Sequence, residues 1–173
     1  MSRHTLSVLV EDKPGVLARV ASLFSRRGFN IESLAVGPTE LPDVSRMTIV
    51  VTVDLLPLEQ VTKQLNKLIP VIKIAEIEAG NGVERELMLV TVKAASEFRS
   101  QVTELAAIFD AKIIDVGFDT LTLMLAGAPS AIEALLDLLK PFGVVEAQRT
   151  GRVALPKLVR KAPAKLRAVK KGA

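Results

Sequence analysis

The stretch EDKPGVLARV, residues 11–20, carries most of the chemistry that this sequence offers. It places two carboxylates, a lysine, a proline and a glycine directly before an apolar helical pattern. Paired carboxylates can act as acid and base, and a glycine before a helix can expose main-chain amides to an anion. Three uses are therefore open: a catalytic loop, a phosphate-binding loop, or a cradle for a smaller anion.

Other reactive side chains are sparse. The chain has no cysteine, which excludes disulfides, thiolate metal sites and cysteine nucleophiles. Its one histidine, His4, lies at the edge of the first predicted strand, where we expect it to be exposed and without a catalytic role. No serine lies in a Gly-x-Ser-x-Gly elbow, and no glycine-rich phosphate fingerprint is present. We predict no catalytic residue, no metal site and no cofactor bound by this chain.

Charge is distributed unevenly along the 173 residues. Residues 152–173 hold eight Lys and Arg and no Asp or Glu, and the remaining 15 basic and 19 acidic residues give that part a net charge of −4. We expect 152–173 to be a basic, disordered tail, in preference to a segment that contacts nucleic acid or an acidic surface. Sequence-specific RNA binding is disfavoured because the predicted central strands, SRMTIVV and TLTLML, offer no aromatic side chains for stacking.

No segment approaches the ~20 apolar residues of a membrane span, and the N-terminus lacks the apolar run of a signal peptide. We therefore expect a cytoplasmic protein without a membrane partner.

Alternating apolar residues and 3.6-residue periodicity predict a strand–helix–strand–strand–helix–strand order in each half of the chain. The first half has strands at 5–10, 30–36, 45–53 and 71–77, a helix that begins near Val16 and is capped by Gly28, and a helix over 57–68. The second half repeats the order with strands at 86–93, 112–118, 120–125 and 144–149, and helical patterns over 98–109 and 129–140.

The fold class that follows is α+β, with two ferredoxin-like βαββαβ sandwiches in tandem. We place the domains at 1–79 and 85–151, joined by a Gly/Asn linker at 80–84. Each sheet has helices on one face only. Because Leu6, Val8, Ile49 and Val51 are not all expected to face the helices, we expect the free face to be covered by association into at least a dimer.

The EDKPG stretch lies in the loop between the first strand and the first helix. Pro14 presets the turn, and Gly15 leaves the helix-start amides of Gly15, Val16 and Leu17 open to a carboxylate. Such a contact contributes only ~0.3–1 kcal/mol at an exposed site, so a second surface must close over the ligand. The alternative is purely structural: Asp12 caps the helix and Pro-Gly forms the turn.

The run from residue 7 to 51 closely resembles the N-terminal ACT domain of acetolactate synthase (acetohydroxyacid synthase) small regulatory subunits. KPGVLARV, LFSRRGFNIESL and SRMTIVV carry the resemblance, and VERELMLVTV and IIDV are similar to that family's C-terminal domain. The resemblance covers residues from about 4 to 155.

The resemblance implies a non-catalytic, allosteric subunit in branched-chain amino-acid biosynthesis. Its partner would be the catalytic large subunit, which uses thiamine diphosphate, magnesium and FAD to make acetolactate or acetohydroxybutyrate. The small subunit is expected to raise that activity and to confer feedback inhibition by valine or a related amino acid. The effector is expected between the ACT domains of a homodimer.

Matching the family's motif residue by residue gives a predicted effector site. The loop contributes Asp12, Pro14, Gly15, Val16 and Leu17, and the second strand contributes Asn30 and Ile31. Helix-start amides would take the effector carboxylate, Asn30 could bridge its carboxylate and ammonium, and the apolar residues could line a pocket for its side chain. Asp12 departs from the family, in which this position is commonly Asn.

The second half lacks the Pro-Gly pair, since its corresponding loop reads KAASEF (93–98). We predict that it does not bind effector in the same way. Two other functions remain open from sequence: a free-standing amino-acid-sensing module that regulates a different enzyme, and a nucleic-acid-associated protein that uses the basic tail.

Overall fold

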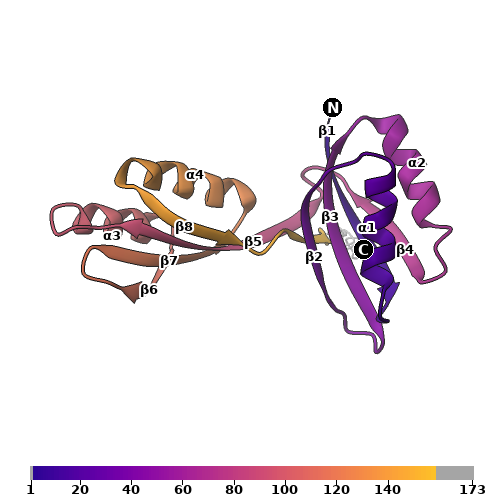
Figure 1. Cartoon of the computed structure of the whole chain (residues 1–173), viewed down its shortest axis with the longest axis horizontal. Coiled ribbons are helices and arrows are strands. Elements are labelled where there is room, and N and C mark those ends of the chain that lie inside the picture. Colours follow the sequence, from indigo (N-terminus) through magenta and orange to yellow (C-terminus); the bar gives the residue numbers. More distant parts are fainter. Residues whose placement is uncertain (1, 159–173) are drawn as a thin grey trace, which may run out of the picture.

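A computed structural model describes residues 2–158, apart from the side chains of Leu55 and Leu56, as two α+β domains in tandem (Figure 1). The first domain contains β1 (Ser2–Glu11), α1 (Val16–Arg26), β2 (Ile31–Pro38), β3 (Val44–Val53), α2 (Leu55–Leu65) and β4 (Val71–Ile77). The second contains β5 (Gly82–Lys93), α3 (Arg99–Ile108), β6 (Lys112–Val116), β7 (Thr120–Gly127), α4 (Pro129–Leu139), a 3₁₀ turn (Lys140–Phe142) and β8 (Val144–Arg149), followed by β9 (Val153–Pro156). The α+β class and the two βαββαβ units are confirmed.

The first sheet is antiparallel, in the order β2-β3-β1-β4, and α1 and α2 cover one of its faces (Figure 1). Period-2 alternation sends Leu6, Val8 and Val10 toward the helices, and each is at most 1% exposed. Ile49 and Val51 join the same core, so the expectation that some of these strand residues face away from the helices is wrong. The second sheet repeats the arrangement in the order β6-β7-β5-β8.

Helix α1 connects β1 to the edge strand β2 and is fixed by one buried stripe. Val16, Val20 and Phe24 recur at four-residue steps and are buried in the core. Gly28, with φ of 71°, ends the helix in the left-handed conformation that the sequence predicts. Helix α2 begins at Leu55, two residues before the predicted start, because Pro57 is tolerated anywhere in a first helical turn.

The predicted linker at 80–84 is wrong from Gly82 onward. Only Gly80 and Asn81 remain in a turn, and β5 then runs for 12 residues as one strand from the first domain into the second. Its first four residues, 82–85, pair antiparallel with β9. Because of this long-range pairing, a segment whose composition is typical of a turn forms a strand.

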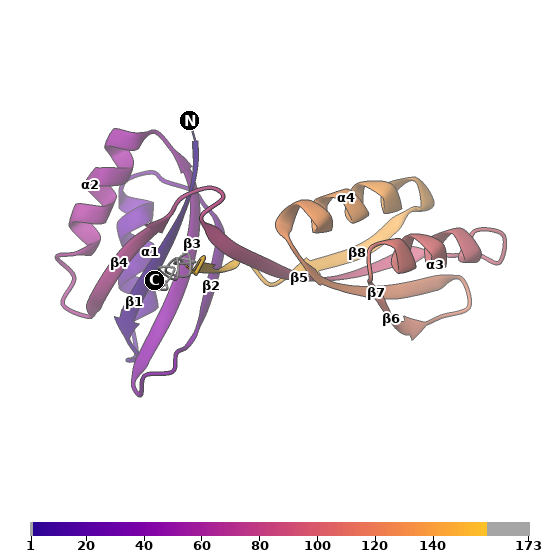
Figure 2. The same ribbon diagram turned by 180° about the vertical axis from the view of Figure 1, so that it is seen from behind.

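The predicted tail is also wrong at its start, because residues 153–156 form β9 and Arg152 is only 8% exposed. Residues 159–173, the rest of that predicted tail, lie outside the described residues. Together β5 and β9 reach the face of the first sheet that α1 and α2 leave free (Figure 2). Thr5, Ser7 and Thr48 are buried on that face, and Arg46 donates to the Ser7 hydroxyl at 2.7 Å.

Among residues 2–158, no helix is long and apolar enough to cross a membrane.

Candidate functional site

The loop between β1 and α1 has the open conformation that an anion cradle requires. Gly15 occupies the N-cap position with φ 83° and ψ −6°, a left-handed conformation that side-chain-bearing residues rarely adopt. No side chain caps the helix. Asp12 instead donates its main-chain N–H to the Asp43 carbonyl at 2.8 Å, so the alternative in which Asp12 caps α1 is wrong.

The helix-start amides are only partly occupied. The Val16 amide donates to the Lys13 carbonyl at 3.4 Å, whereas those of Gly15 and Leu17 meet no acceptor in the part of the chain that the structure describes. A Cβ built on Gly15 would have nothing within 4 Å. Two amides and open space are therefore available to a carboxylate at the positive end of the helix dipole.

The side chains around this cradle differ in what they can offer a ligand. Asp12 and Pro14 are exposed, and Leu17 is 42% exposed. Val16 is 5% exposed and belongs to the core, so only its amide, and not its side chain, could face a ligand.

Asn30 and Ile31 lie at the opposite end of the same sheet. Ile31 is opposite Val51, which is opposite His4, whereas Glu11, just before the cradle, is opposite Val44. His4 and Glu11 are seven positions apart along β1, which corresponds to ~23 Å. One copy of the chain therefore does not bring the two predicted halves of the effector site together.

In the second domain, the corresponding loop is filled by protein groups. The Arg99 guanidinium, at the start of α3, donates to the carbonyls of Ala94 at 3.2 Å and Gly117 at 2.9 Å, and also to that of Phe118. The N-cap residue, Phe98, has an ordinary negative φ. This geometry favours the prediction that the second domain binds no effector in this way.

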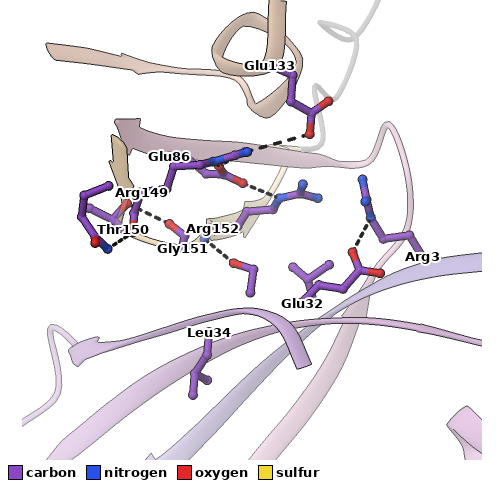
Figure 3. Close-up of a pocket in the computed structure, with 12 residues that line it drawn as sticks. Arg3, Glu32, Leu34, Glu86, Glu133, Arg149, Thr150, Gly151 and Arg152 are labelled. Atoms are coloured by element: carbon purple, nitrogen blue, oxygen red, sulfur yellow. Dashed lines mark hydrogen bonds and ion pairs between the residues drawn. The ribbon is translucent and has the colours of Figure 1, made fainter. Parts of the chain in front are cut away.

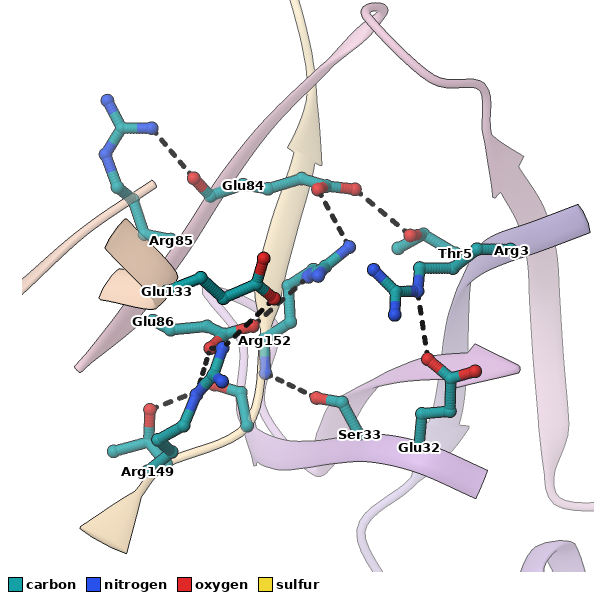
Figure 4. Close-up of polar contacts among 12 residues, drawn as sticks. Arg3, Thr5, Glu32, Ser33, Glu84, Arg85, Glu86, Glu133, Arg149 and Arg152 are labelled. Carbon is teal, nitrogen blue, oxygen red and sulfur yellow. Dashed lines mark hydrogen bonds and ion pairs between the residues drawn. The ribbon is translucent and has the colours of Figure 1, made fainter. Parts of the chain in front are cut away.

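A cluster of charged residues where the domains meet was not predicted from sequence. The cluster consists of Glu84, Glu86, Arg149 and Arg152. Its members other than Glu84 line a cavity of about 540 Å³, together with Arg3 and Glu32 (Figure 3). Arg152 Nε lies 3.3 Å from Glu86 Oε1, and its Nη1 lies 3.1 Å from Glu84 Oε2 (Figure 4). The Thr5 hydroxyl on β1 donates to the other Glu84 oxygen at 3.0 Å. Alternating acidic residues at 84 and 86 were the only sequence signal.

His4 differs from its predicted exposure, because it is 9% exposed. Its Nδ1 lies 2.6 Å from Glu76 Oε1 and its Nε2 lies 2.7 Å from Ser2 Oγ. The ring is thus hydrogen-bonded on both sides, to a partner on β4 and to one on its own strand.

Glu32, at the rim of the cavity, gives a prediction about pH. The Thr52 hydroxyl donates to its carboxylate and lowers its pKa from the ordinary 4.5, and the Arg3 guanidinium lowers it further, against partial desolvation, which raises it. A carboxyl with a depressed pKa in the folded state stabilises the fold above its unfolded pKa, and this contribution is lost as the pH falls through the folded value. We expect the contribution to be at most about 1 kcal/mol, because the pair is partly exposed.

The matching measurement is the pH titration of the Glu32 carboxyl by NMR. Thr52→Val should move its pKa upward, and Thr103→Val, on α3 in the other domain, should leave it unchanged. An unaltered Glu32 titration in Thr52→Val would contradict this account.

Comparison with known proteins agrees with this architecture. Residues 6–73 match the family model of the acetohydroxyacid synthase small subunit-like ACT domain, and residues 85–158 match that of the small subunit of acetolactate synthase. The second match includes β9, in keeping with its pairing to β5.

Full-length relatives extend the similarity across both domains. The chain is 60% identical over 152 residues to the acetolactate synthase small subunit of Mycolicibacterium smegmatis, covering 88% of this chain and 89% of the relative. It is 54% identical over 153 residues to the probable small subunit of Archaeoglobus fulgidus, covering 88% and 96% of the two chains. The crystal structure of the Thermotoga maritima small subunit superimposes with a TM-score of 0.85 at 41% identity, covering 92% of this chain and all of that one. The chain therefore belongs to the family of acetolactate synthase small subunits.

Proposed function

We propose that this chain binds the catalytic large subunit of acetolactate synthase, raises its activity, and makes it subject to feedback inhibition by valine or a related branched-chain amino acid. Thiamine diphosphate, magnesium and FAD are then supplied by the catalytic subunit, and this chain binds none of them. The effector site is formed by two copies of the chain, which meet through their ACT domains.

The observation that carries the proposal is the separation of the cradle from Asn30 and Ile31 within one chain. Strand β2 lies at the edge of its sheet and pairs only with β3 in the described part of the chain. If two copies pair antiparallel along β2, the start of one β2 lies beside the end of the other. Pro38, which ends β2, is opposite Ser45 and so is near the cradle end of the sheet. A two-fold pair thus joins the cradle of one copy to Asn30 of its partner.

The groups so joined match an α-amino acid with an apolar side chain. The open amides of Gly15 and Leu17 supply donors for its carboxylate. The exposed Asn30 side chain can donate to the carboxylate and accept from the ammonium. Leu17 and Ile31, both partly exposed, offer apolar surface to a branched side chain.

Regulation follows if the effector binds two arrangements of the dimer with different affinity. A ligand held between two copies favours one relative orientation of their sheets, and this orientation in turn affects the contact with the catalytic subunit. Coupling of this kind is typically ~1–3 kcal/mol, which is enough for strong but incomplete inhibition.

The test is acetolactate formation by the cognate catalytic subunit, with and without this chain, titrated with valine, leucine and isoleucine. Stimulation followed by inhibition with one of the three supports the whole proposal. Stimulation without inhibition supports the subunit but not the effector site. No effect of the chain on the rate would overturn the proposal and favour a sensor for a different enzyme.

Asp12 gives a prediction of its own, because it places a carboxylate close to the cradle. Asp12→Asn removes that charge, so we expect the effector to bind roughly 2- to 10-fold more tightly, in line with dipole-scale and exposed charge effects. Calorimetry of the effector with each chain measures the change. Asp119→Asn, which removes an exposed charge from a loop of the second domain, serves as the control. Weaker binding by Asp12→Asn would show that the carboxylate instead accepts from the effector ammonium.

A further inference from the structure

The segment that follows β8 returns to the first domain and contacts β2 just after the predicted effector residues. The Arg152 N–H donates to the Ser33 hydroxyl at 2.7 Å. The approach of Gly151 is closer still: a Cβ on Gly151 would lie 2.7 Å from the Leu34 carbonyl oxygen. Backbone therefore touches backbone three to four residues beyond Asn30.

The point of contact is irregular in β2. The pairing of β2 with β3 shifts register between Ile31 and Ser33. A bulge locally weakens the ladder and increases its twist, so the start of β2 depends less on β3 and more on its other contacts. Ser33 and Leu34 gain such a contact from residues 151 and 152.

The other side of the contact is anchored to β5. The Arg152 side chain is 10% exposed and is held by Glu84 and Glu86 on that strand. Arg149 Nε binds Glu86 as well, at 2.9 Å. These ion pairs connect the main chain at Arg152 to β5, which continues as a central strand of the second sheet.

We propose that Arg152 is a positioning residue that links effector binding at the start of β2 to the orientation of the second domain. The inference rests on the proposed function. The path runs from Asn30 and Ile31 through Ser33 to the Arg152 main chain, and then through the Arg152 guanidinium to Glu84 and Glu86. Occupancy of the effector site therefore changes the orientation of the second domain, which has no cradle of its own.

Gly151→Ala tests the contact, and Gly80→Ala is its matched control. Gly151 has φ 81° and Gly80 has φ 83°, so an alanine at either position carries the same backbone strain. The added Cβ meets the Leu34 carbonyl oxygen in Gly151→Ala, whereas a Cβ at Gly80 has nothing within 4 Å. Ser33→Ala, which removes the acceptor without adding any atom, serves as a second variant if Gly151→Ala does not fold.

The measurement is hydrogen–deuterium exchange of the full chain, with and without saturating valine, leucine or isoleucine. In wild type and Gly80→Ala, we expect the effector to slow exchange at 12–17 and 30–31, and also at 149–156. In Gly151→Ala and Ser33→Ala, protection at 12–17 should remain while protection at 149–156 is lost. At saturating effector, the factor by which the effector lowers the rate of the complex should be at least about 5-fold smaller in these two variants. A factor of about 5 is the low end of typical allosteric coupling.

The outcomes separate the two proposals. Protection at 12–17 but not at 149–156 in wild type overturns the link and leaves the effector site standing. Unchanged inhibition in both Gly151→Ala and Ser33→Ala, with 149–156 still protected, also overturns the link. No protection at 12–17 or 30–31 with any of the three amino acids overturns the effector site, and the link with it.

Discussion

Gly15→Asp is expected to abolish inhibition at the effector concentrations that inhibit the wild-type complex, while the chain still stimulates the catalytic subunit. The substitution places a carboxylate where the effector's own carboxylate would meet the start of α1. Like charges ~4 Å apart repel by about 1 kcal/mol in water and by about 4 kcal/mol at an effective dielectric constant of 20. Affinity should therefore fall by a factor between roughly 5 and 1,000.

The fold should tolerate this change. A Cβ at Gly15 meets nothing within 4 Å, so its main cost is the left-handed backbone, about 1–2 kcal/mol. Gly80→Asp is the control, because it carries the same strain in equally open space, away from the cradle. Rate assays across a valine titration should show inhibition for Gly80→Asp but not for Gly15→Asp. Full inhibition of the Gly15→Asp complex at the valine concentrations that inhibit Gly80→Asp would exclude the cradle as the carboxylate site.

Ending the chain at Thr150 is expected to destabilise the fold severely, whereas ending it at Leu158 is expected to leave the stability unchanged. The shorter chain loses Arg152, which leaves Glu84 without its guanidinium partner and Glu86 with Arg149 alone. Glu86 is 5% exposed, and removing one partner of a buried ion pair typically costs about 3–5 kcal/mol. The loss of β9 adds to this, against a total stability of about 5–15 kcal/mol for a typical protein.

Urea unfolding of the two truncated chains beside the full chain measures the difference. The chain ending at Leu158 should match the full chain both in midpoint and in stimulation of the catalytic subunit. Loss of stimulation by the chain ending at Leu158, with its midpoint unchanged, would instead indicate a role for residues 159–173. Equal midpoints for all three chains would mean that the Arg152 contacts do not stabilise the fold.

Local patterns were enough to predict the βαββαβ order of both domains. The alternation in β1 and β3 and the four-residue spacing of Val16, Val20 and Phe24 reflect burial against one face, which a sequence displays directly. The open helix-start amides at Gly15 were also predictable from local residues, since a glycine has no Cβ to block them.

Features that depend on distant residues were not predictable in this way. Val83 and Glu84 follow a turn signal and become a strand only because β9, some 70 residues later, pairs with them. His4 is buried, and the partner of its Nδ1 is Glu76 on β4, 72 residues later. The loop and Asn30 both belong to the predicted site, but their separation to opposite ends of the sheet follows from the strand register, which a motif does not encode.

The pairing of β5 with β9 also has a consequence for the order of folding during synthesis. Each domain has its own helices and core, and domains generally fold as units as they emerge. The partner of Arg85 in this pairing is Val153, 68 residues later (153 − 85). At about 5–20 residues per second, the ribosome needs roughly 3–14 seconds to cover that interval. The first domain therefore has time to fold before β9 exists, and the junction between the domains closes only after that first domain has formed.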